Sequence, residues 1–158
     1  MPVNPIDMMR YGHADIDRAL ARLRPDDWTA IALGVWTTKD LVGHLGAFEV
    51  RFADVLAGFA GESTESDLLS ANPATFNDDQ AAIRRDWPVA QVLGELADAH
   101  ARVMRLAGRI ESDLWREVGT IPWYGPQYAL EELLVYQVYG HKREHKPQLE
   151  AVLDRPGR

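Results

Sequence analysis

The chain has 158 residues, carries a formal net charge of −7 at neutral pH and contains no cysteine. This length favours one domain with a sizeable core, and the acidic balance argues against a nucleic-acid partner, which would need a basic surface. Without cysteine, disulfides, zinc–thiolate sites and a thiol nucleophile from the protein itself are excluded. The first residues lack the basic-then-apolar layout of a signal peptide, and no apolar run approaches the roughly 20 residues of a membrane-spanning helix. We therefore expect a cytoplasmic protein with no membrane partner and a single domain over residues 1–158.

Amphipathic helical patterns dominate the first half of the chain, and no segment there predicts a strand. Apolar residues at three- and four-residue intervals indicate a first helix over about 6–23. A second helix is expected to begin at Thr37, because Thr37 and Asp40 fit a capping box, and to end near Gly61. The segment 61–76 is polar and rich in turn residues, which predicts a long loop or a partly ordered lid.

Two further long helices are expected in the second half. A short helix over 77–85 leads to Pro88, which suits the first turn of the third long helix. An irregular stretch over 113–128 follows, and the last helix spans about 130–153. Pro147 lies inside that helix and should kink it. Four long helices joined in this way predict an all-α four-helix bundle, in which the long loop between the second and third helices permits a crossover.

Three histidines on the apolar faces of these helices are the main candidates for chemistry. His141 and His145 are four residues apart, so their imidazoles project from one helix face and can grip one metal ion. His44 lies on the apolar stripe of the second helix. A single inward histidine is more often satisfied by one hydrogen bond, but three among apolar neighbours lack the partners that one divalent cation would supply. Three converging imidazoles would leave coordination positions open, as a catalytic metal needs.

Neighbouring residues leave several interpretations open. His141 to His145 also fits the H-x-x-E-H pattern of some zinc proteases, but only 13 residues follow His145, too few for the further acidic ligand. We therefore expect Glu144 to face solvent. Glu49, five residues after the second-helix histidine, is expected to point away from it into an ion pair at the helix edge. Gly140 weakens helix propensity and is expected to allow close approach of a neighbouring helix or a substrate.

Four other residues are candidates for the pocket or for orienting a ligand. His13 and His100 lie on or beside the inward faces of the first and third helices, where either can line the cavity. Trp123 and Tyr124 lie in the irregular stretch and can wall a pocket mouth. Taken singly, each of these four is more often structural, the histidines as core residues and the aromatic residues as caps on the core, and the sequence leaves both interpretations open.

Three segments resemble the DinB/YfiT-like superfamily. Residues 36–49 (WTTKDLVGHLGAFE) resemble the family's opening W-[ST]-x-[KR]-[DE]-x-[LV]-x-H-[LI]-x-x-[WF]-E, and residues 139–149 resemble its closing H-x-x-x-H-x-x-Q-[IL]. Residues 76–96 are similar to members grouped with ClbS/DfsB and with mycothiol-dependent maleylpyruvate isomerases. The resemblance implies a four-helix bundle that binds zinc or nickel, and it implies dimers. Its metal ligands correspond to His44, His141 and His145.

The same resemblance suggests an activity. Better-understood members resemble thiol S-transferases that use low-molecular-weight thiols such as bacillithiol, mycothiol or glutathione. Because this chain has no thiol, the thiol must come from a cosubstrate, and a cation with open positions lowers the pKa of a bound thiol or water. We therefore expect a metal-dependent thiol S-transferase that acts on a reactive or electrophilic small molecule, as a homodimer. A metal-dependent hydrolase of the self-resistance type and a non-enzymatic small-molecule-binding bundle are the alternatives.

Overall fold

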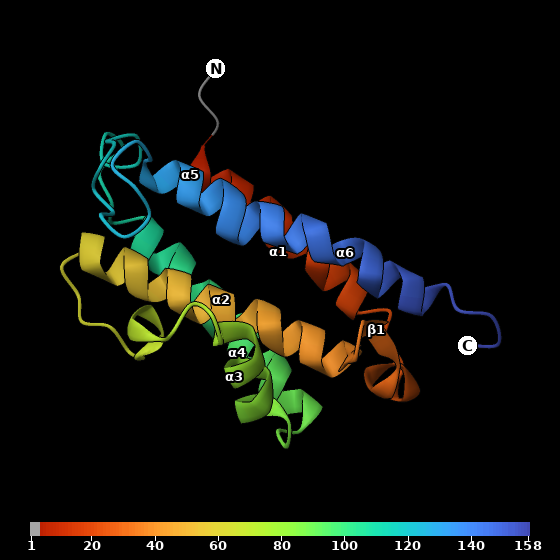
Figure 1. The fold of residues 1–158 in the computed structure, drawn as a ribbon. Coiled ribbons are helices and arrows are strands. Elements are labelled where there is room, and N and C mark those ends of the chain that lie inside the picture. The colour runs from red at the N-terminus through yellow and green to blue at the C-terminus, as the bar shows by residue number, and fades with distance from the viewer. Residues whose placement is uncertain (1–3) are drawn as a thin grey trace.

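The computed structural model describes residues 4–158 (Figure 1). In chain order the elements are α1 (Pro5–Leu20), the 3-10 turn η1 (Pro25–Thr29), β1 (Ile31–Leu33), β2 (Trp36–Thr37), α2 (Thr38–Phe59), the 3-10 turn η2 (Leu68–Ser70), α3 (Phe76–Arg84), α4 (Val89–Ala107), α5 (Leu130–Leu134), the π-helical turn η3 (Val135–Tyr139) and α6 (Gly140–Leu153). The predicted all-α bundle is confirmed, with its four long helices within a few residues of the expected bounds. No helix within residues 4–158 is long and apolar enough to cross a membrane.

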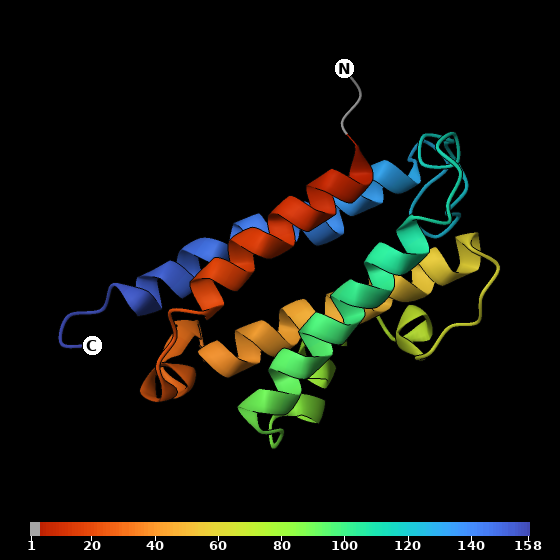
Figure 2. The ribbon, with the colours of Figure 1, turned by 180° about the vertical axis from the view of Figure 1, so that it is seen from behind.

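The bundle consists of two helix pairs. Figures 1 and 2 show α1 lying along the continuous α5–α6 helix and α4 lying along α2. Within each pair the helices run in the same direction, and the two pairs run in opposite directions. The long connection that contains η2 and α3 returns the chain past α2, so that α4 can start beside the beginning of α2. The expected crossover is therefore present.

The core is apolar at both ends of the bundle and polar between them. One apolar cluster includes Met9, Phe52 and Leu106, and the other includes Ile16, Leu45 and Leu96. Burying one such side chain contributes about 1.5–3 kcal/mol relative to leaving it exposed. Between the two clusters each long helix carries a buried polar residue: His13 on α1, Glu49 on α2, Lys142 on α6 and, half-buried, His100 on α4. These four polar side chains therefore lie at one level along the bundle, between the two apolar clusters.

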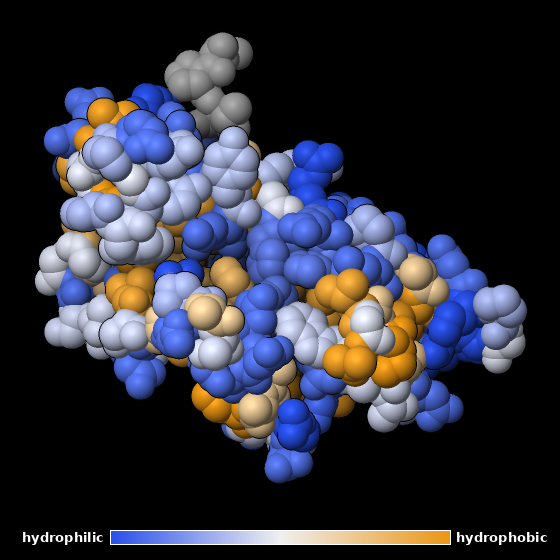
Figure 3. Space-filling view, viewed as in Figure 1, coloured by the Kyte–Doolittle hydropathy of each residue, from blue (hydrophilic) through white to orange (hydrophobic). Residues whose placement is uncertain are grey.

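A small hairpin between α1 and α2 was not predicted. β1 and β2 pair antiparallel through a turn in which Gly34 has a φ of +58°, a conformation that favours glycine. Ile31 and Val35 are 58% and 87% exposed, and apolar side chains gather over this hairpin in Figure 3. Strands of two and three residues that bury little side-chain area leave no alternating apolar pattern for sequence reasoning to detect.

The last helix departs from α geometry before its histidines. At η3 the amide of Gly140 donates to the carbonyl of Val135, a π-type hydrogen bond. A Cβ on Gly140 would lie 2.6 Å from that carbonyl oxygen. The glycine is therefore explained by a close approach within its own helix, rather than by the neighbouring helix or substrate expected from the sequence. Beyond it α6 continues through Pro147 to Leu153.

Candidate metal centre

The start of α2 fixes the position of His44. The predicted capping box is present: the Thr37 amide donates to Oδ2 of Asp40 over 2.9 Å, and the Asp40 amide donates to Oγ1 of Thr37 over 3.2 Å. Such caps contribute about 1 kcal/mol to helix stability. Because the box sets where the first turn begins, His44 lies in the second turn with its side chain directed toward α6.

His44, His141 and His145 form a compact triad. Nε2 of His141 lies 2.7 Å from Nε2 of His44 and 3.0 Å from Nε2 of His145. One nitrogen from each ring lies within 4.8 Å of the other two. His44 and His145 are each 7% exposed, whereas His141 is half-buried. The tertiary structure thus brings together the three imidazoles that the sequence singled out.

Hydrogen bonds alone cannot satisfy both nitrogen–nitrogen contacts of the triad. Nδ1 of His145 lies 2.6 Å from the amide oxygen of Gln148, which only accepts, so Nδ1 carries the proton and Nε2 presents a lone pair. Nε2 of His141 faces two neighbouring nitrogens but offers one proton or one lone pair. If this nitrogen donates its proton to one neighbour, it cannot form a hydrogen bond with the other. If it accepts from His44, the lone pair of His145 has no donor. A divalent cation would accept all three lone pairs.

The spacing also suits a metal. Nitrogens bound to one zinc ion at about 2.0–2.1 Å lie about 2.8–3.4 Å apart at angles between about 90° and 110°. The contact between His145 and His141 already has that length, and the contact between His44 and His141 needs a small outward shift. Three nitrogen ligands leave a fourth position for another molecule.

The surroundings keep His44 and His141 neutral. Burial, followed by the influence of His145, lowers the pKa of His44 to about 4. Burial, followed by His44, His145 and Lys142, lowers the pKa of His141 to about 3. Two aromatic rings contribute to this apolar setting: Trp36 and Phe48 each have a ring centre 4.9 Å from that of His44. Neutral imidazole is the form that binds a metal, so protons compete little near neutral pH.

A second polar cluster lies beside the triad and takes one residue from each long helix. Lys142 donates to Glu49 over 2.8 Å, and Nδ1 of His100 donates to the other Glu49 oxygen over 3.0 Å. His13 and His100 stack with ring centres 3.6 Å apart and planes within 5°. Glu49 and Lys142 are 2% and 3% exposed. The ion pair expected for Glu49 therefore exists, but it is buried in the core rather than placed at the helix edge.

Charge, rather than a metal, accounts for this second cluster. Burial alone would raise the pKa of Glu49, but Lys142 and His100 outweigh it and hold the pKa at about 2. Burial, followed by Lys142 and His100, lowers the pKa of His13 to about 3. Asp17 lies 3.4 Å from His13 but is 58% exposed, so solvent screens its opposing charge. A cation bound by His13, Glu49 and His100 would face the Lys142 ammonium group, which already neutralises the carboxylate.

The remaining sequence candidates lie elsewhere. His13 on α1 and His100 on α4 belong to the second cluster, where their rings stack, and neither is part of the triad. Trp123 lines a cavity near the end of α2, and Tyr124 packs against Trp123 and Tyr128. Glu144 is exposed, as the sequence suggested.

Two partners of these clusters were missed from the sequence. Lys142 directly follows His141, and the sequence alone predicts that such a lysine faces solvent. In the structure it is buried. Gln148 was noted only as part of a motif, yet it sets the tautomer of His145. Gln148 lies three residues after His145, a spacing that places the two side chains on one helix face and could have predicted their contact.

A four-helix bundle that presents a histidine from its second helix to a pair on its last helix defines a DinB/YfiT-like protein. Within that class, the chain belongs to the family described as mycothiol maleylpyruvate isomerase N-terminal domain, whose model matches residues 9–138. The match includes His44 and ends before His141, so the case for the histidine pair rests on geometry. Neither the curated proteins nor the solved structures gave a match to the chain.

Proposed function

We propose that the protein is a divalent-metal-dependent thiol S-transferase that joins a low-molecular-weight thiol to a reactive or electrophilic small molecule. The observation that carries the proposal is the convergence of three imidazole Nε2 atoms, with that of His141 2.7 Å from His44 and 3.0 Å from His145. Zinc or nickel suits this all-nitrogen donor set. The family description names a mycothiol-dependent protein, so mycothiol is the first thiol to test.

Each residue of the site has a defined part in this proposal. His44, His141 and His145 would hold the cation, and Gln148 would orient His145 by accepting from its Nδ1. When bound, the cation lowers the pKa of a thiol that enters its open position, which favours the nucleophilic thiolate. The burial of His44 and His145 limits the access of water, which strengthens these interactions. The resemblance implies that isomerases of this superfamily sometimes have an acid in place of one ligand histidine. Because both members of the α6 pair are histidine here, isomerase activity is not favoured.

Metal analysis of the purified protein tests the proposal. Protein expressed in metal-replete medium should contain about one zinc or nickel ion per chain, and His141→Ala/His145→Ala should contain none. His100→Asn is the matched control, because it changes a histidine of the neighbouring cluster and should retain the metal. A parent protein without metal, or a double variant that keeps it, would contradict the proposal.

Turnover assays separate the transferase from its alternatives. Zinc-loaded protein should consume an electrophile only when a thiol such as mycothiol or glutathione is present, and it should form the thioether. Turnover in thiol-free buffer would favour the hydrolase instead. A small-molecule-binding bundle would show neither activity. The homodimer and the cytoplasmic location expected from the sequence stay predictions.

A further inference from the structure

Arg51 is a half-buried cation on the face of α2 that carries His44. The two residues are seven positions apart, which corresponds to two turns and about 10 Å along the helix axis. Phe48, between them, contacts the rings of His44 and His141 and packs against Phe76. The Phe76 ring in turn lies against the guanidinium group of Arg51. An aromatic surface therefore leads from the histidine triad to Arg51.

No carboxylate within residues 4–158 pairs with Arg51. Its Nε is buried without a hydrogen-bond partner, and its guanidinium carbon lies 5.5 Å and 5.1 Å from the ring centres of Phe76 and Trp123. Burial lowers the pKa of Arg51 from its ordinary value. Asp54, one turn further along α2, is not available, because its oxygens accept hydrogen bonds from Arg102 and from the loop after α2. The buried Nε of this half-buried guanidinium lacks an acceptor, and a bound ligand can supply one.

A cavity adjoins this arginine. It has a volume of about 320 Å³, and Trp123, which stacks on Arg51, forms part of its wall. Its other apolar lining residues are Val55, Phe59, Leu69, Ile121 and Pro122. Asp54 also lines it, whereas Arg51 itself is not part of the lining and reaches the cavity only through its contact with Trp123. The cavity therefore offers room for the apolar part of a small molecule whose anionic group contacts the guanidinium.

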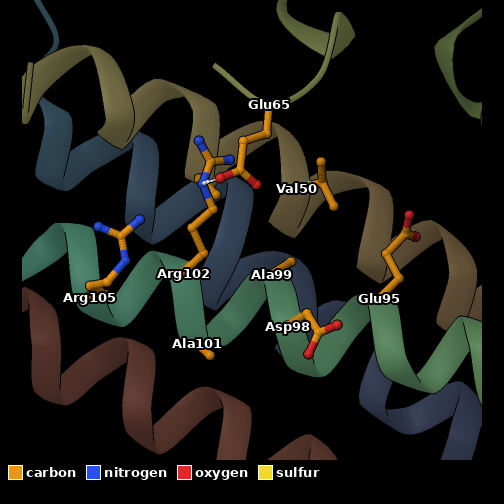
Figure 4. Close-up of a pocket in the computed structure, with 9 residues that line it drawn as sticks. Val50, Glu65, Glu95, Asp98, Ala99, Ala101, Arg102 and Arg105 are labelled. Carbon is orange, nitrogen blue, oxygen red and sulfur yellow. Dashed lines mark ion pairs between the residues drawn. The ribbon is translucent and has the colours of Figure 1, made fainter. Parts of the chain in front are cut away.

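A larger cavity elsewhere in the bundle lacks this feature. It lies along α2 and α4, has a volume of about 560 Å³ and contains no triad residue (Figure 4). Its arginines are neutralised: Arg102 pairs with Asp54 at 2.7 Å and with Glu65 at 3.2 Å, and Arg105 pairs with Glu62 at 2.8 Å. The larger cavity therefore offers no unpaired arginine comparable to Arg51.

We propose that Arg51 binds the carboxylate of a small molecule whose reacting group lies at the histidine triad. The inference rests on the proposed function, because that function makes the triad the place of reaction. The planar guanidinium can bind a carboxylate through two parallel hydrogen bonds. Phe76 and Trp123 hold the group in place and exclude water from its faces, which strengthens such bonds. The carboxylate can belong to the thiol or to the acceptor.

Binding measurements with matched esters test this inference and distinguish the two sources. Zinc-loaded full-length protein is titrated calorimetrically with glutathione and glutathione diethyl ester for the thiol, and with fumarate and dimethyl fumarate for the acceptor. In at least one pair the parent should bind the carboxylate probe about tenfold more tightly than its ester. Arg51→Gln should abolish that preference, and Arg51→Lys should keep part of it. Arg105→Gln, the matched control, should keep all of it.

The outcomes separate this inference from the function on which it rests. If the parent contains zinc and consumes thiol, but Arg51→Gln leaves both preferences within about twofold of the parent, the inference is wrong and the function stands. The same holds if the zinc-loaded parent shows no preference in either pair. A parent that does not bind zinc overturns the function and the inference together. Circular dichroism of Arg51→Lys and Arg51→Gln confirms that each is folded before it is scored.

Discussion

Replacing Glu49 by glutamine should strongly destabilise the protein. The substitution keeps the size of the side chain and an oxygen that accepts from His100, but it removes the negative charge that lies 2.8 Å from the buried Lys142 side-chain nitrogen. Both partners of the ion pair are at most 3% exposed, so solvent cannot take over the role of the carboxylate. Breaking one partner of such a pair costs about 3–5 kcal/mol. We expect Glu49→Gln to lower the free energy of unfolding by that amount.

A double variant distinguishes this cause from a general loss of packing. Glu49→Gln/Lys142→Met removes both charges and should recover most of the lost stability, since an apolar side chain fits the surrounding core. Lys146→Met is the surface control: Lys146 pairs with Asp15 at 2.9 Å, both are partly exposed, and its loss should cost at most about 1 kcal/mol.

Urea unfolding of chelator-treated protein, followed by circular dichroism at neutral pH, gives these free energies without a contribution from bound metal. The reasoning is refuted if Glu49→Gln is no less stable than Lys146→Met. It is also refuted if the double variant is no more stable than the single one.

Two further predictions follow from the helices around the site. Gly140→Ala should lower the free energy of unfolding by about 1–3 kcal/mol and reduce metal retention, because the added Cβ would meet the Val135 carbonyl oxygen at 2.6 Å and shift the following turn. Gly94→Ala is the control: nothing lies within 4 Å of the added Cβ, so the free energy of unfolding should rise by about 0.5–1 kcal/mol. Thermal unfolding and metal content measure both, and equal stability of the two variants would contradict the explanation. The metal-free protein should also lose stability as the pH falls from 6.5 toward 3, because the folded-state pKa of His13 is about 3 and the unfolded chain binds the proton first. His13 alone should account for a loss of roughly 3–5 kcal/mol in the free energy of unfolding over that range. In His13→Gln the free energy of unfolding should therefore depend less on pH. Parallel curves of this free energy against pH for parent and variant would argue against a neutral buried His13.

Local patterns predicted the helices well. The capping box at Thr37 placed the start of α2 correctly, and Pro88 marked the start of α4. Apolar spacing indicated which faces would be buried, because a helix repeats its faces every 3.6 residues whatever surrounds it. The pair His141 and His145 followed from the same rule.

Glu49 shows where this reasoning stops. A helical pattern gives the direction of a side chain relative to its own helix, but α2 is buried on most of its circumference by α3, α4 and α6. A residue that points away from His44 therefore meets another helix rather than solvent. The burial of Lys142 is hidden for the same reason.

The sequence by itself determined the four helices, their approximate ends and the three histidines able to share a metal, since each depends on residues within a few turns of one helix. Only the tertiary structure decided that Glu49 and Lys142 meet in the core and that Arg51 pairs with no carboxylate among residues 4–158. Burial and charge pairing depend on side chains from helices far apart in the chain, so no local pattern records them.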